Sequence, residues 1–214
     1  MKGTRVLLLD LDRTLVDLQS YTDYRAALAD ARAIAGDRTL IRMPETDWDS
    51  PTVGCMATLN TLVGDAQWEE VSSAISGYER AAIPQARVMP TVVQVLPLLR
   101  QHPVAVVTLL PEEVSIDVLT ACGIDVGPGC AIDLVIGRQW HIRPKPAPDG
   151  LLAACVRLGV DPAQATMIGD STWDREAAVA AGIEFIGVPF TAGSLGAEVR
   201  QAVHFAEAVA LACR

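Results

Sequence analysis

The stretch LLLDLDRTLVD, residues 7–17, joins an apolar run to two aspartates that stand two positions apart. The run Val6–Leu9 has the length and composition of a short buried strand. Asp10 and Asp12 follow it directly, although a carboxylate is costly to bury unless it is paired or binds a cation. The stretch therefore predicts a central strand that is followed by two carboxylates, which need a cation or another charged partner.

Further apolar runs of strand length recur along the chain, and segments with helical spacing separate them. The predicted strands are Val104–Val107, a segment near Ile132–Ile136, Ala165–Ile168 and Phe185–Val188. The predicted helices are Glu112–Ala121, Asp149–Leu158 and Trp173–Ala181, and the glycines placed to end them are Gly123, Gly159 and Gly182. Another helical segment, TVVQVLPLLRQ at residues 91–101, contains Pro97, which predicts a kink or a late start. This alternation predicts an α/β fold with a doubly wound parallel sheet.

Residues 17–87 interrupt this alternation with helical patterns only, so we expect a small all-helical cap there. The cap would be inserted after the first strand of an α/β core that comprises residues 1–16 and 88–214. No strand pattern intrudes into the insertion.

Within the insertion, two helices are predicted. Ser20 and Asp23 resemble a capping box ahead of a helix that reaches Gly36, and a second helix covers Gln67–Ile83. The segment between them, RMPETDWDSPTVG at residues 42–54, is typical of a loop.

The composition excludes several classes of function. Half of the 214 residues are hydrophobic, and the formal net charge is −9 with a pI near 4.7. A broad nucleic-acid or acidic-membrane surface needs clustered Lys and Arg, so we expect neither partner. No apolar run approaches the ~20 residues of a membrane span, and the run before Asp10 is too short for a signal-peptide core. Five scattered cysteines without a C-x-x-C pair indicate neither a disulfide framework nor a zinc site, so we expect a cytoplasmic protein.

Polar residues follow three of the predicted strands at their carboxyl ends, where ligands bind in an open parallel sheet. They are Asp10 with Asp12, Thr108 and Asp170, and a loop ahead of a helix adds Lys145. Two close carboxylates repel each other by about 4 kcal/mol at an effective dielectric constant of about 20, and a divalent cation relieves this repulsion. Oxygen ligands favour Mg²⁺ together with a substrate phosphate, whose oxygens Thr108 and Lys145 could bind. The pattern predicts a phosphoryl-transfer site.

Four short motifs occur in an order and at a spacing that cover nearly the whole chain. They are D-L-D-R-T-L at residues 10–15, Thr108, Lys145 in RPKPAPDGLLAA, and GDSTWD at residues 169–174. Together they resemble the haloacid dehalogenase superfamily of phosphohydrolases, which has a Rossmann-like core. The helical insertion is similar to the cap of the phosphoglycolate phosphatase and β-phosphoglucomutase branch.

The resemblance implies a role for each catalytic position. Asp10 would attack phosphorus and form an aspartyl-phosphate, and Asp12 would act first as general acid and then as general base. Thr108 and Lys145 would bind the phosphoryl oxygens and stabilise the charge that develops on them.

The resemblance also implies a magnesium site. Mg²⁺ would be held by Asp10, the backbone carbonyl of Asp12 and Asp170, with Asp174 acting as a ligand through water or as an orienting group. Asp174 also opens a predicted helix, where the helix dipole favours a carboxylate regardless of function. A structural role for Asp174 therefore stays open.

Two positions depart from the pattern of this family. Arg13 stands where the family often has glycine, and Leu109 follows Thr108 where a small or polar residue is commoner. Leu109 can offer only its backbone N–H to a ligand, so these departures bear on substrate identity more than on chemistry.

The scarcity of lysine narrows the function within the family. Of the 17 basic residues 15 are Arg, and the two lysines are Lys2 and Lys145. Phosphonoacetaldehyde hydrolases and β-phosphoglucomutases are expected to use a cap lysine, which residues 17–87 lack, and haloacid dehalogenases lack the second aspartate, here Asp12. A phosphomonoester phosphatase for a small phosphorylated metabolite remains.

Substrate contacts in the cap are predicted from location alone. Arg42, or Arg25 or Arg38, would bind the leaving group if that group is anionic, and the loop at residues 42–54 would hold the specificity. Trp48 in this loop could contact substrate or pack locally.

Two alternative functions stay open. A phosphotransferase would share every motif, and a non-catalytic binding or regulatory domain could keep the fold without the activity. Intact Asp10, Asp12, Lys145 and Asp170 argue against the second alternative.

Overall fold

The computed structural model describes residues 5–36 and 38–214 and contains a five-stranded parallel sheet in the order β5-β4-β1-β6-β7. Its strands are β1 (Val6–Leu9), β4 (Val104–Val107), β5 (Leu134–Ile136), β6 (Ala165–Gly169) and β7 (Glu184–Gly187). β1 lies in the centre, where Leu9 pairs with Val106 of β4 on one side and with Ile168 of β6 on the other. The prediction of a doubly wound parallel sheet is confirmed.

Helices cover both faces of the sheet, and every side chain of β1 and β4 is therefore buried. Alternate side chains of a strand point to opposite faces, so Leu7 and Leu9 pack on one layer and Val6 and Leu8 on the other. The first layer contains α4 (Val92–Leu99), α5 (Glu112–Ala121) and α8 (Phe205–Ala212). The second contains α6 (Asp149–Leu158) and α7 (Thr172–Ala181).

The helix ends follow the predicted chemistry. α6 and α7 end at Gly159 and Gly182, whose backbone φ angles of 69° and 70° lie in the left-handed region that favours glycine. α4 begins at Val92 and contains Pro97, so the predicted late start is wrong, whereas the predicted kink stays a prediction.

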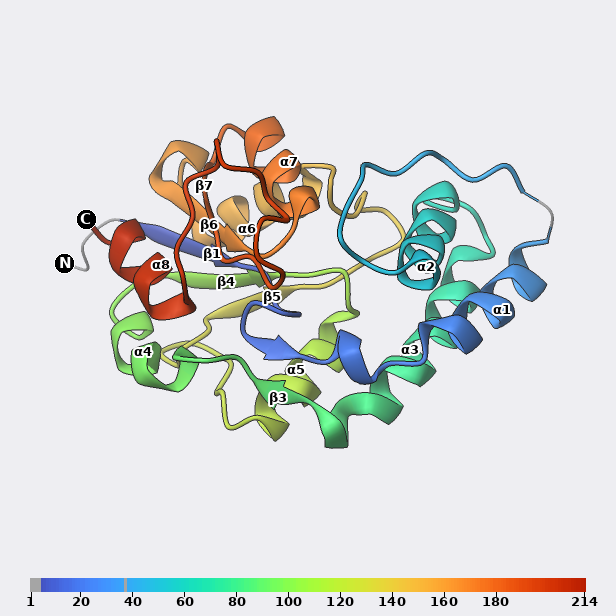
Figure 1. Ribbon diagram of the computed structural model, residues 1–214, viewed down its shortest axis with the longest axis horizontal. Coiled ribbons are helices and arrows are strands. Elements are labelled where there is room, and N and C mark those ends of the chain that lie inside the picture. The colour runs from blue at the N-terminus through green and yellow to red at the C-terminus, as the bar shows by residue number, and fades with distance from the viewer. Residues whose placement is uncertain (1–4, 37) are drawn as a thin grey trace.

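The insertion contains three helices, α1 (Tyr24–Ala35), α2 (Ser50–Thr61) and α3 (Trp68–Ala82), which pack around a hydrophobic cluster of their own (Figure 1). In Figure 1 these cap helices lie beyond the end of the sheet opposite to the chain termini. The carboxyl end of β1 therefore faces the cap.

Two predictions within the insertion are wrong. α1 is capped by Asp23, which accepts from the N–H of Ala26, and Ser20 belongs to a short 3-10 helix at Gln19–Tyr21 instead. The predicted loop ends at Asp49, because this residue caps α2 by accepting from the N–H of Thr52.

Strand residues do border the insertion. β2 (Val16–Asp17) and β3 (Arg87–Val88) pair antiparallel and form the two connections between cap and sheet. Core residues 1–16 include four that lie outside the described residues, and the division at residues 17–87 stays a prediction. Across the described part of the chain, the helices are too short or too polar to cross a membrane.

Candidate active site

The chain turns sharply where it leaves β1, and this turn positions the two aspartates. The N–H of Asp10 donates to the carbonyl of Ile168 at 2.9 Å, so Asp10 still belongs to the sheet edge. The N–H groups of Leu15 and Val16 both donate to the carbonyl of Leu11, which closes the turn. Arg13 has a φ of 63° in this turn, a conformation that favours glycine and explains why glycine suits the position.

Lys145 lies at the centre of the site, although it comes from the loop that follows β5. Its ammonium donates to Asp10 Oδ1 at 2.6 Å, to Asp174 Oδ1 at 2.5 Å and to the carbonyl of Val107 at 2.9 Å. Only 4% of its surface is exposed. A buried ammonium needs such partners, and here it joins residues that lie 135 and 29 positions away in sequence.

Asp174 is held by the first turn of α7. Its Oδ2 accepts from the N–H and the hydroxyl of Ser171 at 3.1 and 2.6 Å, and the Ser171 hydroxyl accepts from the N–H of Asp174. A Cβ at Gly169 would lie 2.6 Å from the Asp174 carboxyl carbon, so only glycine lets this carboxylate approach β6. Asp174 therefore caps its helix and also contacts Lys145.

Asp170 completes a group of three carboxylates. One oxygen of each of Asp10, Asp170 and Asp174 lies within 4.8 Å of the others. Both carboxylate oxygens of Asp170 are buried without a hydrogen-bond partner among the described residues. Unpaired buried oxygens need a cation or a proton, and an all-oxygen set suits Mg²⁺. These residues therefore fit the magnesium ion that the sequence predicts.

Burial raises the pKa values of Asp10 and Asp170 at this edge. The pKa of Asp10 is raised to about 7 by burial, against which the Lys145 ammonium acts, while Asp174 and Asp12 raise it further. Burial and the neighbouring Asp10 and Asp174 hold the pKa of Asp170 well above its ordinary value. Burial lowers the pKa of Lys145, but the carboxylates of Asp10 and Asp174 outweigh burial, so this pKa is raised. The edge therefore attracts positive charge.

Asp12 lies apart from that group and faces the cap. Its Oδ1 accepts from the N–H groups of Leu18 and Gln19 at 2.9 and 3.0 Å, which fixes the carboxyl group. Burial raises the pKa of Asp12 to about 6, although these two N–H donors lower it. Asp12 can thus exchange a proton near neutral pH.

Thr108 lies where β4 ends, and its N–H donates to the carbonyl of Ile136 at 3.0 Å. Together with Asp10 and Asp12 it lines a pocket beneath the cap. Leu109 lines the same pocket and packs against the hydrophobic cluster of the cap. The structure thus brings together five predicted residues of the sheet edge, which are Asp10, Thr108, Lys145, Asp170 and Asp174, and places Asp12 beside them.

The predicted cap contacts are placed differently. Arg42 is exposed and is absent from the pocket lining within the described residues, so its role in binding stays a prediction. Trp48 does line the pocket, and its ring also stacks on Trp173 of α7 with centroids 4.7 Å apart. The predicted local packing of Trp48 is confirmed, and its contact with substrate stays a prediction.

Sequence reasoning missed Arg138, which fastens the cap to the core. This buried guanidinium donates to Glu79 Oε1 at 2.8 Å, to the hydroxyl and carbonyl of Ser72, and to the carbonyl of Leu109. Nothing in the sequence separates Arg138 from the other 14 arginines, because Glu79 lies 59 positions away. It links α3 to the loop that carries Thr108.

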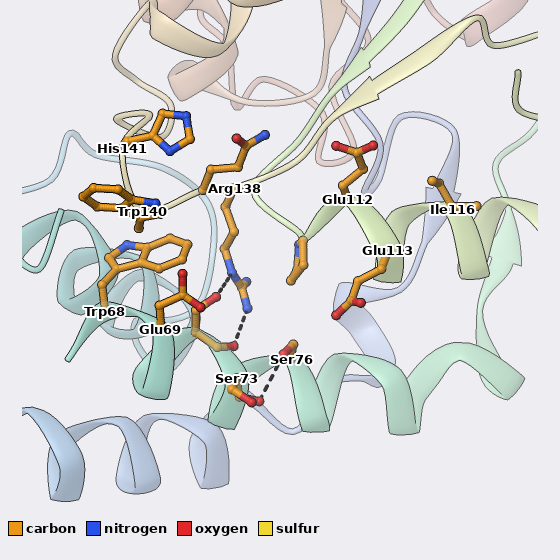
Figure 2. Close-up of a pocket in the computed structure, with 13 residues that line it drawn as sticks. Trp68, Glu69, Ser73, Ser76, Glu112, Glu113, Ile116, Arg138, Trp140 and His141 are labelled. Atoms are coloured by element: carbon orange, nitrogen blue, oxygen red, sulfur yellow. Dashed lines mark hydrogen bonds between the residues drawn. The ribbon is translucent and has the colours of Figure 1, made fainter. Parts of the chain in front are cut away.

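A larger cleft opens on the other side of Arg138, with a volume of about 570 Å³. Figure 2 shows Trp68 and Glu69 of α3 facing Trp140 and His141 across it. None of the predicted catalytic or metal-binding residues lines this cleft within the described part of the chain. Its size therefore does not mark the place of the chemistry.

Comparison with known proteins gives a family match and relatives that cover most of the chain. Residues 4–182 match a family model described as haloacid dehalogenase-like hydrolase. The chain is 33% identical over 196 residues to "Probable phosphatase IndB" of Dickeya dadantii (strain 3937), which covers 86% of this chain and 80% of that protein. It is 28% identical over 193 residues to "Validoxylamine A 7'-phosphate phosphatase" of Streptomyces hygroscopicus subsp. limoneus, covering 87% and 86%.

Among solved structures, CbbY from Rhodobacter sphaeroides in complex with phosphate is similar with a TM-score of 0.69. The match covers 96% of each chain at 19% sequence identity. At that identity the likeness concerns the fold.

Proposed function

The chain belongs to the haloacid dehalogenase-like hydrolase family, and on this basis we propose that it is a phosphatase for small phosphomonoesters. The observation that carries the proposal is the contact of one buried ammonium, Lys145, with two carboxylates beside the unpartnered Asp170. Such a site can neutralise a phosphoryl group that arrives with a cation. Both named relatives are phosphatases by their names, which favours hydrolysis over transfer to another acceptor and over a non-catalytic role.

Asp10 is the nucleophile in this proposal. One of its carboxylate oxygens bonds to phosphorus while the ester P–O bond breaks, and Asp12 gives its proton to the leaving oxygen. Water then attacks phosphorus, Asp12 takes a proton from that water, and the bond to Asp10 breaks. Inorganic phosphate and an alcohol are released, and both aspartates return to their starting states.

The environment of Asp12 supports this double use. Burial raises its pKa to about 6, so an appreciable fraction is protonated just below neutral pH and can act as an acid. The N–H groups of Leu18 and Gln19 both donate to Oδ1 of Asp12, which leaves Oδ2 to exchange the proton. Once the proton has left, the same group is a base.

Lys145 and Thr108 hold the phosphoryl group. Lys145 is fixed by Asp174 and by the carbonyl of Val107, so its third interaction, now with Asp10, can be shared with a phosphoryl oxygen. The Thr108 hydroxyl now accepts from the N–H of Leu110 and can still donate its own proton to the substrate.

The cluster of carboxylates would hold Mg²⁺ through Asp10, Asp170 and the backbone carbonyl of Asp12, and Asp174 would contact the ion through water. Bound there, the ion supplies positive charge to the phosphoryl oxygens and the nucleophile. Ser171 and Lys145 already hold Asp174 in place. Residues 17–87 form the cap in this proposal, and they exclude bulk water from the reaction.

Release of inorganic phosphate tests the proposal. The purified protein would be assayed with a panel of small phosphomonoesters in Mg²⁺ and in chelator, with validoxylamine A 7'-phosphate included because one relative is named for it. Metal-dependent release that is lost in Asp10→Asn supports the phosphatase. Folded protein that releases phosphate from no substrate, including p-nitrophenyl phosphate, would refute it.

A further inference from the structure

The pocket under the cap is very small. The core contributes Asp10, Asp12 and residues 108–110, and the cap contributes Gln19, Tyr24, Trp48, Thr52 and Met56. Its volume of about 30 Å³ holds about one water molecule. A phosphoester needs more room than this, so binding requires the cap to shift, and the cap side chains lie on the side of the leaving group.

Three polar groups on the cap side have no protein partner. They are Nε2 of Gln19, Nε1 of Trp48 and Oγ1 of Thr52, all buried and unpaired among residues 5–36 and 38–214. Gln19 is 7% exposed and Thr52 is 3% exposed, so both are shielded from solvent. Nearly all buried polar groups in proteins are paired with protein or with ordered water, so three unpaired groups on residues that line one pocket are available to a ligand.

These cap groups carry no charge. Within the described residues, the only charged groups lining the pocket are Asp10 and Asp12, on the reacting side. The buried cation between cap and core, Arg138, already contacts Glu79, Ser72 and the Leu109 carbonyl. The buried Lys145 lies on the reacting side, where it contacts Asp10. An anionic leaving group would lose its hydration here and gain no counter-charge, which is costly.

Neutral hydroxyl groups match this lining. The Gln19 amide and the Trp48 indole donate hydrogen bonds, and the Thr52 hydroxyl both donates and accepts. Where the cap lies against the core, the stacking of Trp48 on Trp173 fixes the ring of Trp48. Met56 and the aromatic faces offer apolar contact to C–H groups of the same ligand.

We propose that the substrate is the phosphate monoester of a neutral polyhydroxylated alcohol, such as a sugar, cyclitol or polyol, whose hydroxyls pair with Gln19, Trp48 and Thr52. The inference rests on the proposed phosphatase function and adds the class of the leaving group. It assigns to these three residues the selection against carboxylate-bearing esters, since a site built to pair with hydroxyls discriminates strongly by what is left unpaired.

Matched substrate pairs test the leaving group. Glucitol 6-phosphate and 6-phosphogluconate differ by a CH₂OH in place of a carboxylate, and 2-hydroxyethyl phosphate and 2-phosphoglycolate form a shorter pair. We expect kcat/KM to be at least about tenfold higher for the neutral member of each pair. Equal or higher values for the anionic members would overturn the inference.

Variants that remove one polar group test the named residues. Gln19→Met and Thr52→Val keep the side-chain shape and should each raise KM for glucitol 6-phosphate by about three- to tenfold, the value of one neutral hydrogen bond. The matched control is Thr58→Val in the same helix, because the Thr58 hydroxyl donates to the carbonyl of Gly54 and does not line the pocket. It should leave KM unchanged.

The hydrolysis of p-nitrophenyl phosphate separates the two possible failures. Its leaving group has no hydroxyl to pair, so the ratio of kcat/KM for glucitol 6-phosphate to that for the aryl ester should fall in Gln19→Met and Thr52→Val. An unchanged ratio in both variants refutes the role of the cap residues while the phosphatase stands. Absence of hydrolysis of every ester, the aryl ester included, refutes the phosphatase and the inference together.

Discussion

The two sides of the pocket treat their polar groups in opposite ways. On the core side Lys145 contacts Asp10 and Asp174 directly, and the charges are buried against one another. On the cap side Gln19 and Thr52 present neutral groups that contact no described partner. The contrast suggests a division of labour in which core charges determine the rate for every ester, and neutral cap groups choose among esters.

The largest expected effect is on the core side. Asp10→Asn removes the attacking oxygen, so kcat should fall by about 10⁴-fold or more for every substrate, neutral or anionic. Phosphate release measures this, and thermal unfolding checks that the variant folds. A loss confined to some of the esters would break the comparison, because the core would then contribute to selection.

The next largest effect is expected at Arg138, which connects the two sides of the pocket. Arg138→Met leaves Glu79, which is fully buried, without its cation and should destabilise the protein by about 3–5 kcal/mol. Denaturant unfolding measures this free energy. The double variant with Glu79→Met should recover part of the loss, since no buried charge then remains unpaired. A double variant as unstable as the sum of the singles would show that the pair itself is not the cause.

A smaller effect of opposite sign is expected at Asp170. Asp170→Asn removes a buried carboxylate whose two oxygens lack partners, so in chelator it should stabilise the fold by about 1–3 kcal/mol at pH 7.5. The same variant should lose metal-dependent activity. Asp117→Asn is the control, because that carboxylate is exposed and pairs with Arg80 at the surface. If Asp170→Asn is instead less stable in chelator, the carboxylates do not repel one another.

The pH dependence of stability sharpens the same point. The pKa values of Asp10 and Asp12 are raised to about 7 and about 6, and that of Asp170 is also raised, so the folded state binds protons more tightly than the unfolded state. Their contribution to stability is therefore full below about pH 4 and is lost as pH rises through 6 and 7. In chelator the melting temperature should fall by several degrees from pH 5 to 7.5, and Mg²⁺ should restore more of it at the higher pH. A metal-induced shift that shrinks with pH would contradict this.

The core side of the pocket is more predictable from the amino-acid sequence than the cap side, for a physical reason. Val6–Leu9 and Val104–Val107 are recovered to the residue because strands buried on both faces must be apolar throughout. The polar residues that follow them had to meet at one sheet edge, and they do. The confirmed family match adds the order of the motifs.

The structure of the cap is harder to predict from the sequence, because the interactions that determine it are not periodic. α2 was hidden by a proline that belongs to its first turn, Pro51, since proline suits that position yet also marks loops. Arg138 and Glu79 meet across 59 positions, and the need for Gly169 arises only from the approach of Asp174. Such facts depend on the packed chain, so no window of sequence contains them.

The smallest expected effect concerns Arg42, the predicted cap cation. It is exposed and lies outside the pocket lining among the described residues, so Arg42→Ala should change KM by less than about twofold for the neutral and the anionic member of each substrate pair. Arg32→Ala, an exposed arginine of α1, serves as the control. A tenfold rise in KM for the anionic esters alone would mean that Arg42 reaches the leaving group when the cap closes on substrate. The cap would then supply charge to the pocket, and the contrast between the two sides of the pocket would hold only before substrate binds.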